Sequence, residues 1–424
     1  MNMNNRRPGI NRREFIKVSV TSIAAATGLS RFGKAQTMAN QDSIKPFKIE
    51  VPEAVLNDLR ERLAKTRFPD QLEGVGWSYG TDLSYLKELC EYWRSEFDWR
   101  AQERALNRFD HFRTEIDGLG IHFIHQRSKE KNAIPIIITH GWPGSFVEFT
   151  KIIESLTDPV AHGGRAENAF DVICPSIPGY GFSDAPKKSG FGCRQVAEVF
   201  AKLMAKLGYT QYGAQGGDWG AVISTWLAAI DAAHVMGLHL TMTMGNPPEE
   251  TSTEASEELS SKEKEDLEKM NQADDMEGGY AAIQSTKPQS LGYALNDSPA
   301  GLAAWIVEKF HKWSDCGGNV EKKFTKDELL TNIMIYWVTQ SITSSMRIYY
   351  EARATGWKLV PEEKVTVPTG CTLSPIEPQL PRKWVEESFN VTHWTVMPSG
   401  GHFAAFEEPE FLVKDTRKFF RTLR

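Results

Sequence analysis

Apolar residues recur with a helical period near the start of this 424-residue chain. In VPEAVLNDLRERLAKTRFP, the apolar residues that precede Pro69 lie on one helical face: Val55, Leu56, Leu59 and Leu63. Such spacing predicts an amphipathic helix, which Pro69 would end. LSYLKELCEYWRSEFDW has the same pattern and predicts a second helix. Residues 43–112 are therefore expected to form a helical region.

From residue 113 the period changes, and β-rich runs alternate with helical patterns. FRTEIDGLGIHFIH predicts a hairpin around Asp117 and Gly118. The continuous apolar runs IPIIIT and FDVICP predict strands buried on both faces, VAEVFAKLMAKLGY a helix, and QYGAQGGDWGAVIS a strand, a tight turn and a helix. This alternation predicts an α/β protein with a mostly parallel sheet.

A charged, helical stretch at residues 246–350 interrupts that alternation, and strands resume in KVTVPTGC and HWTVMPSGGH. Helices inserted between two parts of a sheet indicate a cap domain. We expect the sheet-containing core to comprise residues 113–245 and 351–424, with the helical cap between them.

Residues 1–36 have the features of a targeting signal. NRREFIKV contains a twin arginine, a short apolar stretch follows, and Gly33 and Ala35 precede a possible cleavage point after Ala35. This arrangement resembles a signal for the Tat export machinery and predicts a periplasmic or secreted bacterial protein. Without such a signal, the protein would be cytoplasmic. No apolar run has the ~20 residues that a stable membrane span needs.

Charge and cysteine content narrow the classes of partner. The net charge is −6, although residues 1–36 are strongly basic, so the remainder is acidic. An acidic body argues against nucleic acid as a partner. The five cysteines form no CxxC pair, which argues against a disulfide framework and structural zinc. No metal or organic cofactor is expected, and the sequence assigns no oligomeric state.

The turn GGDWG follows a predicted strand and precedes a predicted helix, with Asp218 at its centre. In α/β-hydrolases the nucleophile occupies such a turn, usually written GxSxG. A carboxylate nucleophile can attack a saturated carbon to give an alkyl ester, which suits epoxides and alkyl halides. Taken alone, an aspartate in a glycine-rich turn is also compatible with a structural role.

Three further motifs accompany this turn. HGWPG follows the strand IPIIIT, and the backbone N–H groups of Trp142 and Trp219 are candidates for an oxyanion hole. His402 follows the last predicted strand and is the candidate base. Its acid partner is expected after KVTVPTG at Glu377, and the rival acids are Glu362, Glu386 and Glu387.

An epoxide oxygen is a poor leaving group, so a proton donor is needed beside it. Phenols of the predicted cap are candidates: Tyr280, Tyr293, Tyr336, Tyr349 and Tyr350.

Together HGWPGSFVEF, PSIPGYGFSD, GGDWG, IQSTKPQSLGYALNDSPAGLAAWIVEKF, YWVTQSITSSMRIYYE, VPTG and GGHFAAFEEPE resemble the microsomal epoxide hydrolase family, which includes juvenile hormone epoxide hydrolases. The resemblance runs from about residue 43 to the end. It implies an α/β-hydrolase core with an inserted cap and an N-terminal extension, acting on a small hydrophobic epoxide and water. The roles that it implies are nucleophile for Asp218, base for His402, acid partner for Glu377, and epoxide-polarising phenols for Tyr280 and Tyr349, with Tyr350 as an alternative to Tyr349.

Two other functions remain open at this level. A haloalkane dehalogenase shares the aspartate nucleophile and the tryptophan that follows it, but needs N–H donors for halide in place of phenols. A catalytically silent carrier of hydrophobic ligands could use the same scaffold.

Overall fold

The computed structural model describes residues 43–245, 259–356, 358–359 and 363–424. The predicted export signal at residues 1–36 and the rival acid Glu362 lie outside these residues. Among the helices that are described, none has both the length and the hydropathy that crossing a bilayer requires.

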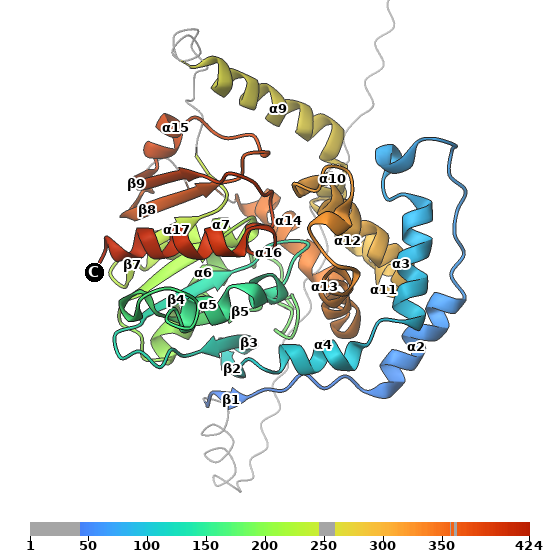
Figure 1. The fold of residues 1–424 in the computed structure, drawn as a ribbon, viewed down its shortest axis with the longest axis horizontal. Coiled ribbons are helices and arrows are strands. Elements are labelled where there is room, and N and C mark those ends of the chain that lie inside the picture. Colours follow the sequence, from blue (N-terminus) through green and yellow to red (C-terminus); the bar gives the residue numbers. More distant parts are fainter. Residues whose placement is uncertain (1–42, 246–258, 357, 360–362) are drawn as a thin grey trace, which may run out of the picture. The chain divides into compact units, whose positions relative to one another are not determined.

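A nine-stranded sheet runs through the molecule in the order β1-β2-β3-β5-β4-β6-β7-β8-β9 (Figure 1). The pairs β1–β2, β2–β3 and β3–β5 are antiparallel, and the other five pairs are parallel, which confirms the predicted mostly parallel sheet. The strands are β1 (Lys45–Pro46), β2 (His111–Ile116), β3 (Leu119–Gln126), β4 (Ile134–Thr139), β5 (Phe170–Pro175), β6 (Tyr212–Gly216), β7 (Val235–Leu240), β8 (Val365–Leu373) and β9 (Phe389–Val396).

The predicted hairpin and buried strands are confirmed. Asp117 and Gly118 join β2 to β3 with φ angles of 52° and 79°, as the two central residues of a type I′ turn require. All residues of β4 and β5 are buried except Pro135 and Asp171, because helices cover both faces of the sheet.

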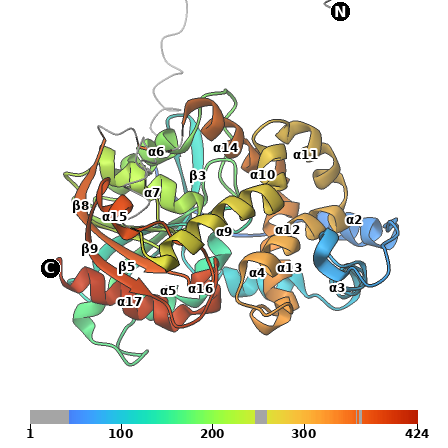
Figure 2. The ribbon, with the colours of Figure 1, turned by 90° about the horizontal axis from the view of Figure 1, so that it is seen from above.

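Helices α6 (Cys193–Lys206) and α7 (Trp219–Ile230) lie on one face of the sheet, and α5 (Ile153–Thr157) and α17 (Pro409–Arg421) lie on the other (Figure 2). Helix α7 contacts β4, β6, β7 and β8, and it is buried along most of its length. Short elements complete the layers: η2 (Phe146–Lys151), η3 (Ala166–Asn168), α15 (Arg382–Glu386) and α16 (Ala404–Glu407).

Helices α9 to α14 lie between β7 and β8 in the sequence, within and just beyond the predicted cap. They are α9 (Ser261–Glu277), α10 (Gly279–Gln284), α11 (Pro288–Asp297), α12 (Pro299–Trp313), η4 (Val320–Lys322), α13 (Lys326–Thr339) and α14 (Ile342–Thr355). Capping boxes begin α9 and α13, where Ser260 pairs with Glu263 and Thr325 with Glu328.

The N-terminal region forms α2 (Glu53–Ala64), η1 (Gly76–Tyr79), α3 (Leu83–Ser95) and α4 (Trp99–Leu106). Two sequence predictions are wrong in detail. Helix α2 ends at Ala64, before Pro69 is reached. The second predicted helix, which covers residues 83–99, ends earlier, at Ser95, and a separate helix α4 begins at Trp99, where the Asp98 side chain accepts a hydrogen bond from the Ala101 N–H. These helices pack against α12 and α13.

Candidate active site

The predicted nucleophile turn joins β6 to α7 at the carboxyl edge of the sheet. Asp218 has φ 50° and ψ −130°, an unusual conformation for a non-glycine residue. Gly220 has no room for a side chain, since a Cβ there would lie 1.9 Å from the Thr139 carbonyl oxygen of β4. The small residues therefore let the turn approach its neighbouring strand and leave Asp218 at the apex.

Backbone amides converge on the Asp218 carboxylate. The Trp142 N–H donates to Asp218 Oδ1 at 2.7 Å, and the Trp219 N–H also donates to this carboxylate. The loop after β4 can come this close because residue 141 is glycine, where a Cβ would lie 2.2 Å from Oδ1. The structure thus brings together both of the predicted oxyanion-hole amides.

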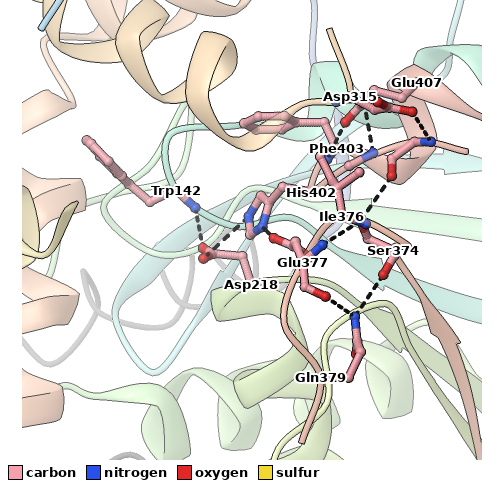
Figure 3. A network of polar contacts seen from close by, with 12 residues as sticks. Trp142, Asp218, Asp315, Ser374, Ile376, Glu377, Gln379, His402, Phe403 and Glu407 are labelled. Carbon is pink, nitrogen blue, oxygen red and sulfur yellow. Dashed lines mark hydrogen bonds and ion pairs between the residues drawn. The ribbon is translucent and has the colours of Figure 1, made fainter. Parts of the chain in front are cut away.

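His402 lies between two carboxylates (Figure 3). Its Nδ1 is 2.7 Å from Glu377 Oε1, and its Nε2 is 3.6 Å from Asp218 Oδ2. Asp218 follows β6, Glu377 follows β8 and His402 follows β9, so all three come from the edge where parallel strands end.

Glu407, a buried acid, holds the loop that carries His402. Glu407 Oε2 accepts hydrogen bonds from the Gly401 N–H at 2.9 Å and the Asp315 N–H at 2.8 Å, and its Oε1 accepts from the Phe403 N–H at 3.1 Å (Figure 3). Burial raises the pKa of Glu407, although these backbone donors oppose the rise. The sequence analysis missed this role, because a glutamate in FEEPE has no distinguishing spacing.

The charges of the site perturb one another. Burial raises the pKa of Asp218, whereas His402 and the two tryptophan amides oppose the rise. Burial alone would lower the pKa of His402, but the carboxylates of Glu377, Asp218 and Glu148 outweigh it and raise this pKa to about 9. With this pKa, His402 is an imidazolium near neutral pH, and it lies between the carboxylates of Asp218 and Glu377.

Two of the candidate phenols lie beside the nucleophile turn. The Tyr280 ring stacks on the Trp142 ring at 5.4 Å, and the Tyr349 ring meets the Trp219 ring edge to face at 4.7 Å. The two phenol rings are 5.8 Å apart. Burial raises the pKa of Tyr349 well above its usual value.

The Tyr349 hydroxyl makes no hydrogen bond of acceptable geometry within the described residues. The Trp219 indole nevertheless lies close enough to oppose the rise in the pKa of this phenol.

The remaining candidates lie elsewhere. Tyr350 and Tyr293 are 46% and 71% exposed, and the Tyr336 hydroxyl donates to the Gly144 carbonyl oxygen at 2.6 Å. Glu386 pairs with Arg382 on the surface, and Glu387 is exposed. Geometry thus separates Tyr349 from its neighbour Tyr350, and Glu377 from the two rival acids that the structure describes.

A small pocket of about 20 Å³ adjoins Asp218 and His402, and Glu148 lines it. Burial raises the pKa of Glu148 to about 8, with a further contribution from Asp218 that His402 opposes. Thr139 and Gln215 also line this pocket, and their buried Oγ1 and Oε1 atoms lack hydrogen bonds within the described residues. A cavity of about 10–15 Å³ can hold one water molecule when polar groups surround it. No spacing in the sequence marked these three residues.

Among the described residues, no group of three or more histidine, cysteine, aspartate or glutamate side chains is arranged so that it could hold a metal ion. All five cysteines are buried free thiols. The side chains around Asp218 include carboxylates, an imidazole and phenols.

Comparisons with known proteins agree with this architecture. Residues 44–149 match a family model described as the epoxide hydrolase N terminus, and residues 134–273 match one for the alpha/beta hydrolase fold. The chain is 45% identical over 415 residues to epoxide hydrolase 1 of Sus scrofa, covering 92% of this chain and 91% of that protein.

Solved structures give the same result. The crystal structure of juvenile hormone epoxide hydrolase from the silkworm Bombyx mori superposes with a TM-score of 0.85 at 37% identity, covering 92% of this chain and 97% of that chain. The Aspergillus niger epoxide hydrolase superposes with a TM-score of 0.80 at 34% identity, covering 91% and 97%.

Fold and site thus define an α/β-hydrolase with an aspartate in the turn between β6 and α7. The chain belongs to the microsomal epoxide hydrolase family, and it is an epoxide hydrolase.

Proposed function

We propose that the protein converts a small hydrophobic epoxide and water into a vicinal diol through a covalent ester on Asp218. The observation that carries this proposal is the convergence of the Asp218 carboxylate, the His402–Glu377 pair and two phenols. No metal or organic cofactor takes part in the proposed steps.

In the first step, an Asp218 oxygen attacks the less hindered epoxide carbon. The carbon–oxygen bond breaks, its electron pair moves to the oxygen, and the phenols of Tyr280 and Tyr349 donate hydrogen bonds to that oxygen. A proton transferred from a phenol completes the hydroxyl group. Such general acid catalysis typically contributes about 10²–10⁴-fold in rate.

In the second step, His402 removes a proton from water, which attacks the carboxyl carbon of the ester. The Trp142 and Trp219 amides stabilise the resulting oxyanion. Because ester formation removes the negative charge of Asp218, one cause of the raised pKa of His402 disappears, and a larger fraction of the imidazole is neutral and able to accept a proton. We propose that the pocket lined by Glu148, Thr139 and Gln215 holds this water. The oxyanion then collapses, the ester carbon–oxygen bond breaks, and the departing diol oxygen takes the proton from His402. The Asp218 carboxyl group that forms releases its proton, which returns through His402 to the phenolate.

A single turnover in heavy-oxygen water tests the covalent route. The oxygen that is added to the epoxide carbon should carry no label, because it comes from Asp218. The label should instead appear in the peptide that contains Asp218. Asp218→Asn should form no ester that intact-mass spectrometry can detect. Full labelling of the diol in the first turnover would contradict the proposal.

One structural feature bears on the haloalkane dehalogenase alternative. The indole Nε1 atoms of Trp142 and Trp219 are buried and lack hydrogen bonds within the described residues, so they resemble halide-binding donors. The relatives reported above are nevertheless epoxide hydrolases. A Tyr280→Phe/Tyr349→Phe double variant should lose epoxide turnover, and chloride release from alkyl chlorides would instead favour the alternative.

We further propose that residues 246–350 act as the cap and that residues 1–36 direct Tat-dependent export to the periplasm. The position of α9 to α13 and most of α14 between the two parts of the sheet supports the first point. A reporter fused to residues 1–36 should be exported, and replacing Arg12 and Arg13 with lysine should retain it in the cytoplasm.

A further inference from the structure

A lysine is buried beside one of the two phenols. Lys309, near the end of α12, is only 5% exposed, although lysine is seldom buried without a partner. Its Nζ lies 4.5 Å from the centre of the Tyr280 ring and 5.4 Å from that of the Trp313 ring. Its ion-pair partner is the neighbouring Glu308, at 2.7 Å.

The two phenols are therefore electrostatically different. An ammonium group over an aromatic ring is attracted to it, and more strongly where water is excluded. The attraction grows when the ring gains negative charge, as a phenol does when it releases its proton. No cation lies over the Tyr349 ring among the described residues, and the Asp218 carboxylate acts on that phenol instead.

Resting on the function proposed above, we propose that Lys309 is a positioning residue that makes Tyr280 the proton donor to the epoxide oxygen, while Tyr349 keeps its proton and only donates a hydrogen bond. The epoxide oxygen gains the proton, Tyr280 becomes a phenolate, and Lys309 stabilises that phenolate until the proton released in ester hydrolysis returns. Neither half-reaction needs a further reactant.

The charged and titratable groups around Tyr280 come from several elements. Lys309 and Glu308 belong to α12, and Tyr349 belongs to α14. Asp218 and His402 are one contact further away, through Trp142 and Trp313 respectively. Lys309 is the cation whose distance to the Tyr280 ring is shortest among the described contacts.

The test separates the two half-reactions by stopped-flow tryptophan fluorescence and rapid-quench mass spectrometry, with styrene oxide as the probe. Lys309→Met keeps the aliphatic stem but removes the charge, so ester formation should slow about tenfold, while ester hydrolysis should hold its rate. Lys309→Arg should restore most of the loss. Lys312→Met is the matched control, since Lys312 lies on the same helix but is about half exposed and pairs with Glu277.

A double-mutant cycle assigns the effect to one phenol. In a Tyr280→Phe background, Lys309→Met should cause no further loss in the rate of ester formation. In a Tyr349→Phe background, it should cause the same loss as in the wild type. The proposal would be overturned if Lys309→Met slowed ester formation equally in both backgrounds, or if it slowed only ester hydrolysis.

If Lys309→Met does not fold, Glu308→Gln provides the second measurement. Removing the carboxylate strengthens the field of Lys309 on Tyr280, so ester formation should become faster, and a slower rate would count against the proposal. Detection of the Asp218 ester in the wild-type protein tests the underlying mechanism separately.

Discussion

The main-chain carbonyl of Trp313 accepts a hydrogen bond from the main-chain N–H of His402 at 2.8 Å. The Trp313 ring also lies 5.0 Å from the His402 ring and 5.2 Å from the Tyr280 ring. The end of α12 thus contacts both the candidate base and a candidate phenol. Because α12 belongs to the helical insertion, the position of the base depends on the packing of that insertion.

Gly401→Ala should disturb this contact. A Cβ at residue 401 would lie 2.3 Å from the Trp313 carbonyl oxygen, so the loop that carries His402 must move. A displacement of about 1 Å in a reacting group can cost on the order of 10²-fold in rate. We expect a loss of this size in kcat, measured by steady-state turnover of styrene oxide.

Gly279→Ala is the matched control for this variant. It lies next to Tyr280, yet nothing lies within 4 Å of the position that its Cβ would take. Its turnover should stay within about twofold of wild type, because alanine is compatible with helix α10. Equal losses in the two variants would show that the Trp313 contact does not position His402.

Glu377→Gln should slow ester hydrolysis more than ester formation. Glu377 is the foremost cause that raises the pKa of His402, and an amide neither stabilises the imidazolium nor selects the same tautomer. The expected loss is about 10²–10⁴-fold, by comparison with the corresponding change in a serine protease triad. The alkyl-enzyme should then accumulate, which intact-mass spectrometry after rapid quenching can measure. A variant that accumulates no ester and loses only the first step would exclude this role.

Glu148→Gln tests the buried acid beside the proposed water pocket. Because the pKa of Glu148 is raised from 4.5 to about 8, the folded protein binds more protons than the unfolded chain between these pH values. This group therefore lowers the stability of the wild type as pH rises through that range, and glutamine removes the effect. The Tm difference between Glu148→Gln and wild type should increase in favour of the variant from pH 5 to about pH 8.

The catalytic effect of the same substitution provides an independent check. Glutamine replaces the carboxyl group beside the proposed water with an amide of different hydrogen-bonding groups, so ester hydrolysis should slow in Glu148→Gln, and ester formation should change less. Any pH dependence of hydrolysis near pH 8 that comes from Glu148 should disappear. If both half-reactions keep their wild-type rates and pH profiles, Glu148 has no part in holding the water.

Acid should destabilise the protein through its buried histidines. His122 Nε2 lies 2.9 Å from His111 Nδ1, and burial holds the pKa of both rings below 6.5. The neutral rings contribute stability that is present above about pH 6.5 and is lost as pH falls toward the folded-state pKa. The Tm should fall between pH 7 and 5, and His122→Asn should flatten this dependence while lowering Tm overall. His162→Asn, a substitution of an exposed histidine, should leave the slope unchanged.

Local pattern was sufficient for much of the architecture. The strands β4 and β5 were predictable because a strand covered on both faces must be apolar throughout, and the β2–β3 hairpin because Asp117 and Gly118 tolerate positive φ. The end of α3 at Ser95 was not predictable in this way, because the amphipathic pattern continues to Trp99, where Asp98 caps the start of α4.

The sequence by itself determined the kinds of reactive group, since a carboxylate in a glycine-flanked turn, a histidine after the last strand and an acid after VPTG follow one another in the chain order of this fold. Only the tertiary structure decided which phenol faces the turn, because Tyr349 and Tyr350 are adjacent residues that helix α14 directs to different surroundings. The same holds for Glu148, Glu407 and Lys309. Their roles depend on burial and on partners distant in the sequence, which no local spacing encodes.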